Sequence, residues 1–230
     1  MVKRIIIVPD VHGRLFWNDI TDRITESNLV IFLGDYVDPY PHENISKEEA
    51  IKNFRNIIEF RKKHDNCILL LGNHCLGYVF PEVCQCRRDL AHYAEIANLY
   101  YNNDDLFQIV YKYQHNDKTY IFSHAGIHNE LLQHYNIDVN NINELFHDKD
   151  RNLREYLSEV SFYRGGYGSY GSCVWADIRE FLAKEEVQNN TYQIVGHTMI
   201  ERPYIGENMA CLDCKKCFTL NLDTNTIEEL

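Results

Sequence analysis

Five short motifs in this 230-residue sequence place metal-ligand residue types directly after apolar runs. Mixed carboxylate, amide and imidazole donors suit borderline-hard divalent ions such as Mn, Fe or Zn. A single catalytic ion must keep one coordination position open for water, so it uses fewer than six protein donors. Two ions about 3.5–4 Å apart, which share one carboxylate, would use all six. The six donors are Asp10, His12, Asp35, Asn73, His124 and His197.

Each of these residues could instead have an isolated role in a turn. A single His at the end of a strand is more often structural than a metal ligand, and Gly-Asp after a strand is common. The pattern recurs five times, however, each time beside a glycine and after an apolar run. This repetition favours one shared site over five coincidences.

The apolar runs are expected to be strands that position these motifs. Ile5–Val8, Leu29–Leu33 and Cys67–Leu71 are fully apolar, as in strands covered on both faces. Strand and helix patterns alternate here, so these strands should form βαβ units and lie parallel, with their motifs at one edge of the sheet. Thr119–Phe122 and Tyr192–Val195 are expected to be strands that end at the last two motifs.

Hydrophobic spacing predicts helices between and after these strands. A capping box, Ser46 to Glu49, should begin a long helix. The other expected helices are one through Phe16, Ile20 and Ile24, a cap over the site at about 81–103 through Leu90, Ala94 and Ala97, one spanning 142–157, and one from Trp175 through Ile178 and Leu182.

The C-terminal pattern predicts two more strands. Met209–Leu212 and Phe218–Leu222 are expected to form an antiparallel hairpin that closes a second sheet. No linker or repeat array divides the chain, so residues 1–230 are expected to form a single α/β domain.

The charge balance limits the classes of partner. Acidic residues number 34 against 23 basic ones, for a formal net charge of -11, which argues against the backbone of DNA or RNA as a partner. A small phosphorylated substrate stays compatible, because bound metal ions would reverse the local sign. No apolar run approaches the roughly 20 residues of a membrane span, and Ile5–Val8 is too short for a signal peptide. The protein is therefore expected to be cytoplasmic, with no membrane partner.

Eight cysteines raise the question of a disulfide scaffold or a second metal site. A closed zinc site usually takes two separated pairs of ligands. Cys211, Cys214 and Cys217 are one ligand short, and Cys84 and Cys86 form only one pair. Reduced thiols that pack as small buried residues are the favoured interpretation, with a structural metal or redox role as the alternative.

In their order along the chain, the five motifs resemble those of the calcineurin-like metallophosphoesterase family. They are Asp-Val-His-Gly at 10–13, Gly-Asp-Tyr-Val-Asp at 34–38, Gly-Asn-His at 72–74, His-Ala-Gly at 124–126 and Gly-His-Thr at 196–198. The resemblance extends from Asp10 to Asp213 and is nearest to the phosphoprotein phosphatase and diadenosine tetraphosphatase branch. It implies a four-layer fold, a two-sheet β-sandwich flanked by helices.

The resemblance also implies a role for each site residue. It implies a first ion on Asp10, His12 and Asp35, and a second on Asn73, His124 and His197, with Asp35 bridging the two. His74 resembles the family's catalytic histidine, and Asp38 resembles the carboxylate that orients it. The implied reaction is phosphomonoester hydrolysis, in which hydroxide held by the metal ions attacks phosphorus in line and His74 protonates the leaving alkoxide.

Three function classes are compatible with this resemblance. The first is a phosphomonoesterase similar to Ser/Thr protein phosphatases. The second is a nucleotide or dinucleoside polyphosphate hydrolase, in which the tyrosines of 100–113 or 163–170 would stack on a base. The third is a non-catalytic binding protein, which would be expected to lack a ligand, whereas all six are present.

The sequence departs from that branch at two positions. Pro39-Tyr40 replaces Arg-Gly, and Cys75 replaces Glu. The missing Arg would normally grip the substrate phosphate, so another Arg is expected to do so. Arg164, beside two glycines, is the leading candidate, although it could instead pair with a surface carboxylate. Arg202 is the second candidate, and Arg14 is the third because it could instead begin a helix as a solvated residue.

Overall fold

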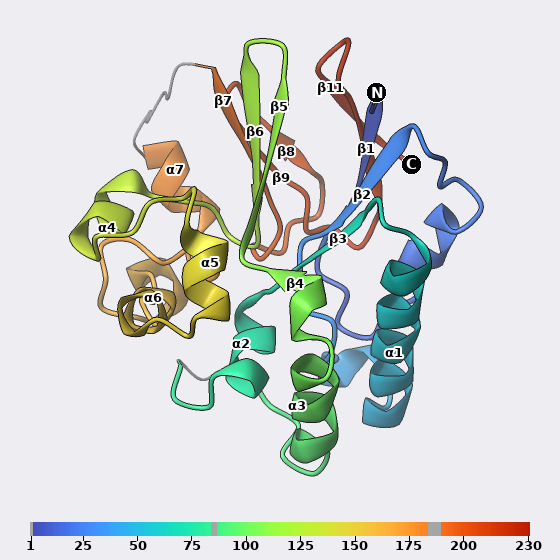
Figure 1. The fold of residues 1–230 in the computed structure, drawn as a ribbon, viewed down its shortest axis with the longest axis vertical. Coiled ribbons are helices and arrows are strands. Elements are labelled where there is room, and N and C mark those ends of the chain that lie inside the picture. The colour runs from blue at the N-terminus through green and yellow to red at the C-terminus, as the bar shows by residue number, and fades with distance from the viewer. Residues whose placement is uncertain (1, 84–86, 184–189) are drawn as a thin grey trace.

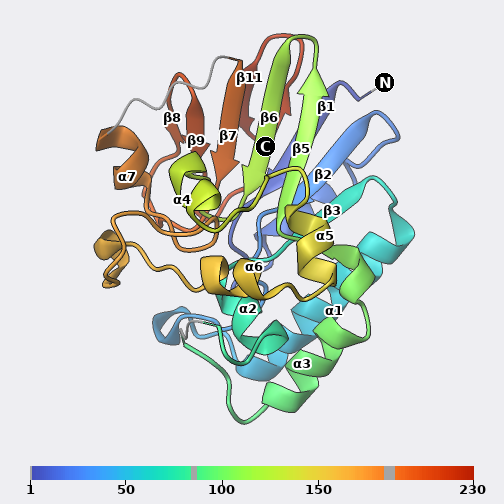
Figure 2. The same ribbon diagram turned by 60° about the vertical axis from the view of Figure 1, so that its left-hand side comes forward.

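The computed structural model describes residues 2–83, 87–183 and 190–230, and it contains two β-sheets with helices on both sides (Figures 1 and 2). Sheet A has six strands in the order β11-β10-β1-β2-β3-β4, and sheet B has five in the order β5-β6-β7-β9-β8. The strands of sheet A are β1 (Arg4–Val8), β2 (Asn28–Phe32), β3 (Cys67–Leu70), β4 (Phe107–Gln108), β10 (Phe218–Asn221) and β11 (Thr226–Glu229). Those of sheet B are β5 (Val110–His115), β6 (Lys118–Ser123), β7 (Thr191–Val195), β8 (Tyr204–Ile205) and β9 (Met209–Cys211).

The centre of sheet A is parallel, as the sequence predicts. Ile7 of β1 pairs with Ile31 of β2, which pairs in turn with Ile68 of β3. All three strands therefore end at the same edge of the sheet, and β6 and β7 of sheet B are parallel as well. The expected convergence of the strand-end motifs depends on this topology.

Alternate residues of the central strands face two different cores. Ile5 and Ile7 pack with Phe122 and Ile194 of sheet B in the space between the sheets. Ile6 and Val8 are buried on the opposite face of sheet A, in a core that includes the apolar stripe of the first helix. Both faces are therefore covered, which is why these strands are apolar throughout.

The helices form the outer layers. They are α1 (Lys47–Lys63), α2 (Asn73–Val79), α3 (Tyr93–Tyr101), α4 (Asn129–His134), α5 (Ile142–His147), α6 (Arg151–Leu157) and α7 (Ile178–Ala183). The Ser46 side chain accepts a hydrogen bond from the Glu49 N–H, and the Glu49 side chain accepts one from the Ser46 N–H, so the predicted capping box starts α1. Ile178 of α7 packs against Val195 and Met209 on the outer face of sheet B. The expected α/β fold of two sheets flanked by helices is confirmed.

Two expected α-helices are wrong. Phe16–Ile20 is a short 3-10 helix, in which Trp17 and Ile20, three residues apart, are the buried side chains. The helix expected over 142–157 is two helices, because Lys149 adopts a left-handed conformation with φ of 56° and Asp150 caps α6 through the N–H of Leu153.

The C-terminal hairpin is also wrong. β9 pairs in parallel with β7 in sheet B, whereas β10 pairs with β1 in sheet A. The chain therefore passes from one sheet to the other between Cys211 and Phe218, and the real C-terminal hairpin is β10–β11. Pairing partners are non-local contacts that the alternation of residues within a strand does not encode.

Two helix boundaries differ from expectation. α7 begins at Ile178, so Trp175 lies in the turn before it, and Leu182 is 52% exposed. Within the expected cap, α3 spans only Tyr93–Tyr101, and Leu90 precedes it and is 78% exposed.

Among the described residues, no helix is both long and apolar enough to span a bilayer.

Candidate metal centre

The six predicted donors come together at the ends of five strands. Asp10 and His12 follow β1, Asp35 follows β2, and Asn73 begins α2 after β3. The last two, His124 and His197, follow β6 and β7. Donors from both sheets therefore converge on one buried point, which the separate strand-end motifs predicted.

His124 is the centre of one group of donors. Its Nε2 atom lies 3.0 Å from Asn73 Oδ1, 3.0 Å from His197 Nδ1 and 3.3 Å from Asp35 Oδ2. Ligands bound to one ion at about 2.0–2.2 Å lie roughly 3 Å from one another. The spacing of these four donors therefore fits a shared divalent ion.

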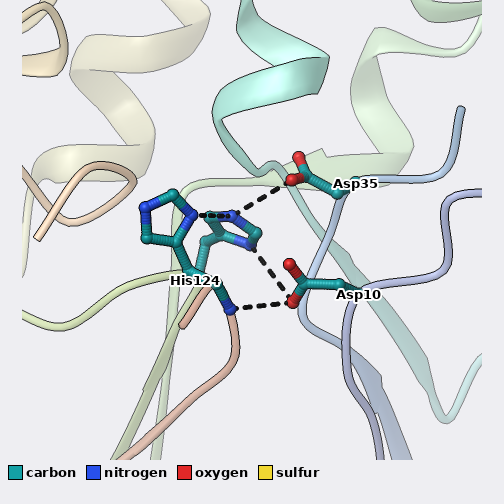
Figure 3. A group of neighbouring side chains, drawn as sticks. Asp10, Asp35 and His124 are labelled. Carbon is teal, nitrogen blue, oxygen red and sulfur yellow. Dashed lines mark hydrogen bonds and ion pairs between the residues drawn. The ribbon is translucent and has the colours of Figure 1, made fainter. Parts of the chain in front are cut away.

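A second group lies on the other side of Asp35. The same Asp35 Oδ2 atom is 3.6 Å from His12 Nε2, and donor atoms of His12, Asp35 and His74 lie within 4.8 Å of one another. Asp10 lies with the first group, since its Oδ1 is 3.9 Å from His124 Nδ1. Figure 3 shows the carboxylates of Asp10 and Asp35 directed toward His124. Asp35 thus faces imidazole nitrogens of both groups, as a bridging carboxylate would.

Backbone carbonyls fix the orientation of two of the imidazoles. His12 Nδ1 donates to the carbonyls of Val37 and Asp38, at 3.0 and 3.1 Å, and His124 Nδ1 donates to that of Leu33 at 2.9 Å. The Nε2 atom of each ring therefore points to the centre, the usual arrangement of a metal-binding His.

The buried carboxylates favour positive charge at the centre. Burial lowers the pKa of His124, but Asp35 and Asp10 more than offset this and raise it to about 9. Burial lowers the pKa of His12 to about 3 and, with the charges of Arg164 and His124, lowers that of His197 well below its ordinary value. These two imidazoles are thus neutral and able to bind a cation, which the carboxylates would stabilise.

The site imposes unusual backbone conformations. His12, Asp35, Asp38 and His197 all have positive φ, between 46° and 63°, which costs roughly 1–3 kcal/mol at each non-glycine residue. The loops support one another, since the N–H of His12 donates to the carbonyl of Asp35 at 2.6 Å. Strained residues that gather in this way are typical of functional sites.

Two motif glycines leave room for the carboxylates. A Cβ atom on Gly72 would lie 2.2 Å from Asp35 Oδ1, and one on Gly196 would lie 2.2 Å from Asp10 Oδ1. Any side chain at either position would displace a predicted metal ligand. This close approach explains why Gly precedes both Asn73 and His197.

His74 and Asp38 also meet. His74 Nδ1 lies 3.0 Å from Asp38 Oδ2 and 3.1 Å from the carbonyl of Arg87. The other nitrogen, Nε2, is then available on the side of His12, whose ring centroid is 4.9 Å away. A carboxylate that holds the far side of an imidazole in this way suits a proton donor or acceptor.

Sequence reasoning missed the residues that hold Asp38. Asp38 Oδ1 accepts hydrogen bonds from the Tyr78 hydroxyl at 2.7 Å and from the Asp89 N–H at 3.2 Å. Tyr78 lies one helical turn after His74 in α2, a spacing that could have indicated a shared role. Asp89 comes from the loop before α3 and carries no such signal.

Tyr78→Phe should lower kcat by about 10-fold, because Asp38 would lose a hydrogen bond to a charged group, worth about 1.5–3 kcal/mol, and would hold His74 less firmly. Steady-state kinetics with an alkyl phosphate would measure this loss. Metal content and KM should stay unchanged, and Tyr101→Phe, at a tyrosine that is 72% exposed, is the matched control. Equal kinetics for both variants would show that Tyr78 does not position Asp38.

The three arginines predicted to bind phosphate lie in three different environments. Arg164 lies beside the centre: its Nη2 donates to the carbonyl of His197 at 3.0 Å and to Thr198 at 2.8 Å, and its Nε pairs with Asp177 at 2.9 Å. Arg14 is 9% exposed, and it donates to both carboxylate oxygens of Glu43 and to the carbonyl of Asp10. Arg202 is exposed at the surface after β7. A substrate contact by any of the three stays a prediction.

Five of the six described cysteines are buried free thiols. Burial raises the pKa of Cys211 and Cys217 to about 12, and Cys214 is only partly buried. Among the described side chains, the groups suited to hold a metal contain no Cys. Cys75, which replaces Glu, is buried against Asp35 and accepts a hydrogen bond from its N–H at 3.2 Å. Cys84 and Cys86 lie outside the described residues.

Comparison with known proteins identifies the family. The model of the calcineurin-like phosphoesterase family matches residues 3–201, which is most of the chain, so the chain belongs to this family. Members use a dinuclear metal centre, and the chain is a metal-dependent phosphoric ester hydrolase. A search of curated protein sequences returns no match.

Several solved structures share the fold at low sequence identity. A cold-active protein tyrosine phosphatase is 16% identical, with a TM-score of 0.59 over 100% of this chain and 79% of its own. A protein serine/threonine phosphatase from Saccharomyces cerevisiae with similarity to human phosphatase PP5 is 13% identical, with a TM-score of 0.55 over 99% of this chain and 79% of its own. A metallophosphoesterase from Sphaerobacter thermophilus is 11% identical, with a TM-score of 0.50 over 100% of this chain and 89% of its own.

Proposed function

We propose that this phosphoesterase is a phosphomonoesterase with two divalent ions, manganese being the first choice. Asp10, His12 and Asp35 would hold the first ion, and Asp35 would share the second with Asn73, His124 and His197. The position of Asp35 carries the proposal, because its Oδ2 lies 3.6 Å from His12 Nε2 and 3.3 Å from His124 Nε2. Oxygen and imidazole donors without thiolates suit Mn, Fe or Zn, and Mn is the ion proposed for reconstitution.

The protein residues divide the remaining chemistry between them. Two divalent ions, when bound, supply a water of lowered pKa and positive charge against the phosphoryl oxygens. His74 donates a proton from Nε2 to the leaving oxygen, and Asp38 holds Nδ1 and stabilises the protonated ring. Tyr78 and the N–H of Asp89 keep the Asp38 carboxylate in place.

A substrate panel tests the proposed function. Protein reconstituted with Mn should hydrolyse an aryl phosphate, and EDTA should abolish this activity until Mn is restored. A phosphopeptide, a dinucleoside polyphosphate and an aryl phosphodiester should be compared at the same Mn concentration. We expect the highest kcat/KM on a monoester. Equal rates with and without metal, or a preference for the diester, would contradict a metal-dependent phosphomonoesterase.

Exposed aromatic side chains favour nucleotide hydrolysis as a second candidate function. Phe162 and Tyr167 are 72% and 104% exposed, on the segment that also carries Arg164, which contacts the His197 loop. Tyr163 is 42% exposed, and the Arg179 guanidinium lies over its ring at 4.6 Å. Aromatic faces exposed near a phosphate site suit stacking on a nucleobase. Tyr100 is 2% exposed and packed in the core, so it cannot stack on a base. A higher kcat/KM on the dinucleoside polyphosphate than on the phosphopeptide would favour this candidate.

A further inference from the structure

The arginines nearest the metal centre differ in how many of their donors are already used. Arg14 directs Nε and Nη2 to Glu43 and Nη1 to the carbonyl of Asp10, so each of its nitrogens has a partner. Arg164 is anchored by Asp177, Thr198 and the carbonyl of His197. A phosphoryl group that approaches a centre rich in carboxylates needs a cation whose N–H groups are still available.

Arg87 meets this requirement. It is an exposed residue of the loop before α3. Among the described residues its guanidinium has one hydrogen-bond partner, the carbonyl of Asp38, which accepts from Nη2 at 2.9 Å. The side chain is exposed and has no ion pair with a described carboxylate, so within the described residues a ligand could bind its N–H groups without breaking an ion pair.

Two contacts place the Arg87 guanidinium beside His12, and a third, made by its backbone carbonyl, places the residue beside His74. The carbonyl of Asp38 that accepts from Arg87 also lies 3.1 Å from His12 Nδ1. The guanidinium carbon lies 4.1 Å from the centroid of the Tyr40 ring, which is 4.9 Å from the centroid of the His12 ring. The Arg87 carbonyl is itself 3.1 Å from His74 Nδ1.

Tyr40 stabilises this position. A guanidinium over an aromatic face is attracted by the ring quadrupole, typically by about 0.5–1 kcal/mol when exposed. The stacked geometry also reduces the number of rotamers available to a long side chain, so less entropy is lost when a ligand binds. Pro39-Tyr40, where an Arg-Gly pair is missing, thus supplies the aromatic surface for an arginine from a distant loop.

We propose that Arg87 binds the non-bridging phosphate oxygens of the substrate beside His12 and His74, in the position left without an arginine at Pro39. The proposal rests on the proposed function, since it names the phosphate-binding side chain of that same site. A planar guanidinium can donate to two phosphate oxygens at once, which a single lysine ammonium cannot reproduce. Arg164, which donates to the carbonyl of His197, is the other arginine beside the centre.

Phosphate binding tests this proposal without turnover. Calorimetric titration of the Mn-loaded protein with inorganic phosphate should show Kd raised by about 10-fold or more in Arg87→Ala, with Arg87→Lys between this variant and wild type. KM for an aryl phosphate should rise in parallel. Bound Mn should stay at the wild-type level.

Arg88→Ala is the matched control, because it removes the same charge one residue away. The Arg88 guanidinium donates to the carbonyl of Pro81 at 3.2 Å and lies 6.0 Å from the Tyr93 ring, so its phosphate Kd should equal that of wild type. An unchanged Kd in Arg87→Ala, an equal rise in Arg88→Ala, loss of Mn from Arg87→Ala, or no phosphate binding by Mn-loaded wild type would each overturn the proposal.

Different experimental outcomes would contradict the proposed function and the proposed role of Arg87. If wild type hydrolyses no ester yet binds phosphate in an Arg87-dependent manner, the proposed function is wrong and the role of Arg87 stands. If wild type is an active phosphomonoesterase and Arg87→Ala leaves both Kd and KM unchanged, the role of Arg87 is wrong and the function stands. Unfolding curves followed by circular dichroism show whether each variant is folded.

Discussion

Asp35→Asn should lose at least about 10²-fold in kcat/KM on an aryl phosphate. Loss of a mere outer-shell partner already costs about 10–100-fold in metal affinity or activity, and Asp35 faces both donor groups. The neutral amide would remove the negative charge that both ions need and leave only one oxygen as a ligand. Turnover and bound Mn should therefore fall together.

The Asp35 carboxylate also has a structural role, so its replacement needs controls. Asp35 Oδ1 accepts a hydrogen bond from the His74 N–H at 2.9 Å, which an Asn oxygen can still accept. Asp65→Asn, at a fully exposed carboxylate, makes the same chemical change away from the site and should match wild type. Wild-type turnover in folded Asp35→Asn would contradict a bridging role.

His74→Asn should slow hydrolysis of an alkyl phosphate by roughly 10²–10⁴-fold, the usual scale for a general acid or base. The loss should shrink for an aryl phosphate with a good leaving group, because such an anion departs without a proton. Rates measured across esters of increasing leaving-group pKa would give this dependence. His134→Asn, at an exposed histidine of α4, is the control.

Metal content separates acid catalysis from metal binding at His74. Donor atoms of His12, Asp35 and His74 lie within 4.8 Å of one another, so His74 has the position to be a ligand of the first ion. The proposed mechanism makes it a proton donor instead, and bound Mn should then be unchanged in His74→Asn. Loss of one ion, with equal slowing of good and poor leaving groups, would assign His74 to the metal.

The sequence predicts the central parallel strands and the convergence of the donors well. Apolar runs such as Ile5–Val8 and Cys67–Leu71 are strong local signals, and each ends in a turn whose side chains must lie at one sheet edge. The family resemblance implies which of the two ions each residue holds. The positions of Asp35 and His124 are compatible with that assignment, which stays a prediction.

The errors occur where non-local contacts decide the structure. The spacing of Phe16, Ile20 and Ile24 fits an α-helix, but Trp17 and Ile20 are buried at a spacing of three, and the Trp17 Nε1–H donates to Asn53 at 2.9 Å. β9 and β10 are adjacent in sequence yet belong to different sheets. No pattern within either segment specifies a partner strand.

Arg87 and Asp89 show the same limit at the site. Both lie in a loop before α3 without a motif of its own, and they reach Asp38 over 49 and 51 residues. Sequence reasoning could state that an arginine was missing at Pro39. It could not point to Arg87, because loop positions are set by tertiary contacts such as the stacking of Arg87 on Tyr40.

The stoichiometry and magnetic coupling of bound manganese test the dinuclear centre most directly. Wild-type protein reconstituted with Mn, freed of excess metal and measured by elemental analysis and electron paramagnetic resonance, should contain two ions per chain. Its spectrum should be that of a spin-coupled pair, because Asp35 would bridge the ions. One ion per chain, with the six-line spectrum of an isolated Mn(II), would contradict the two-metal centre.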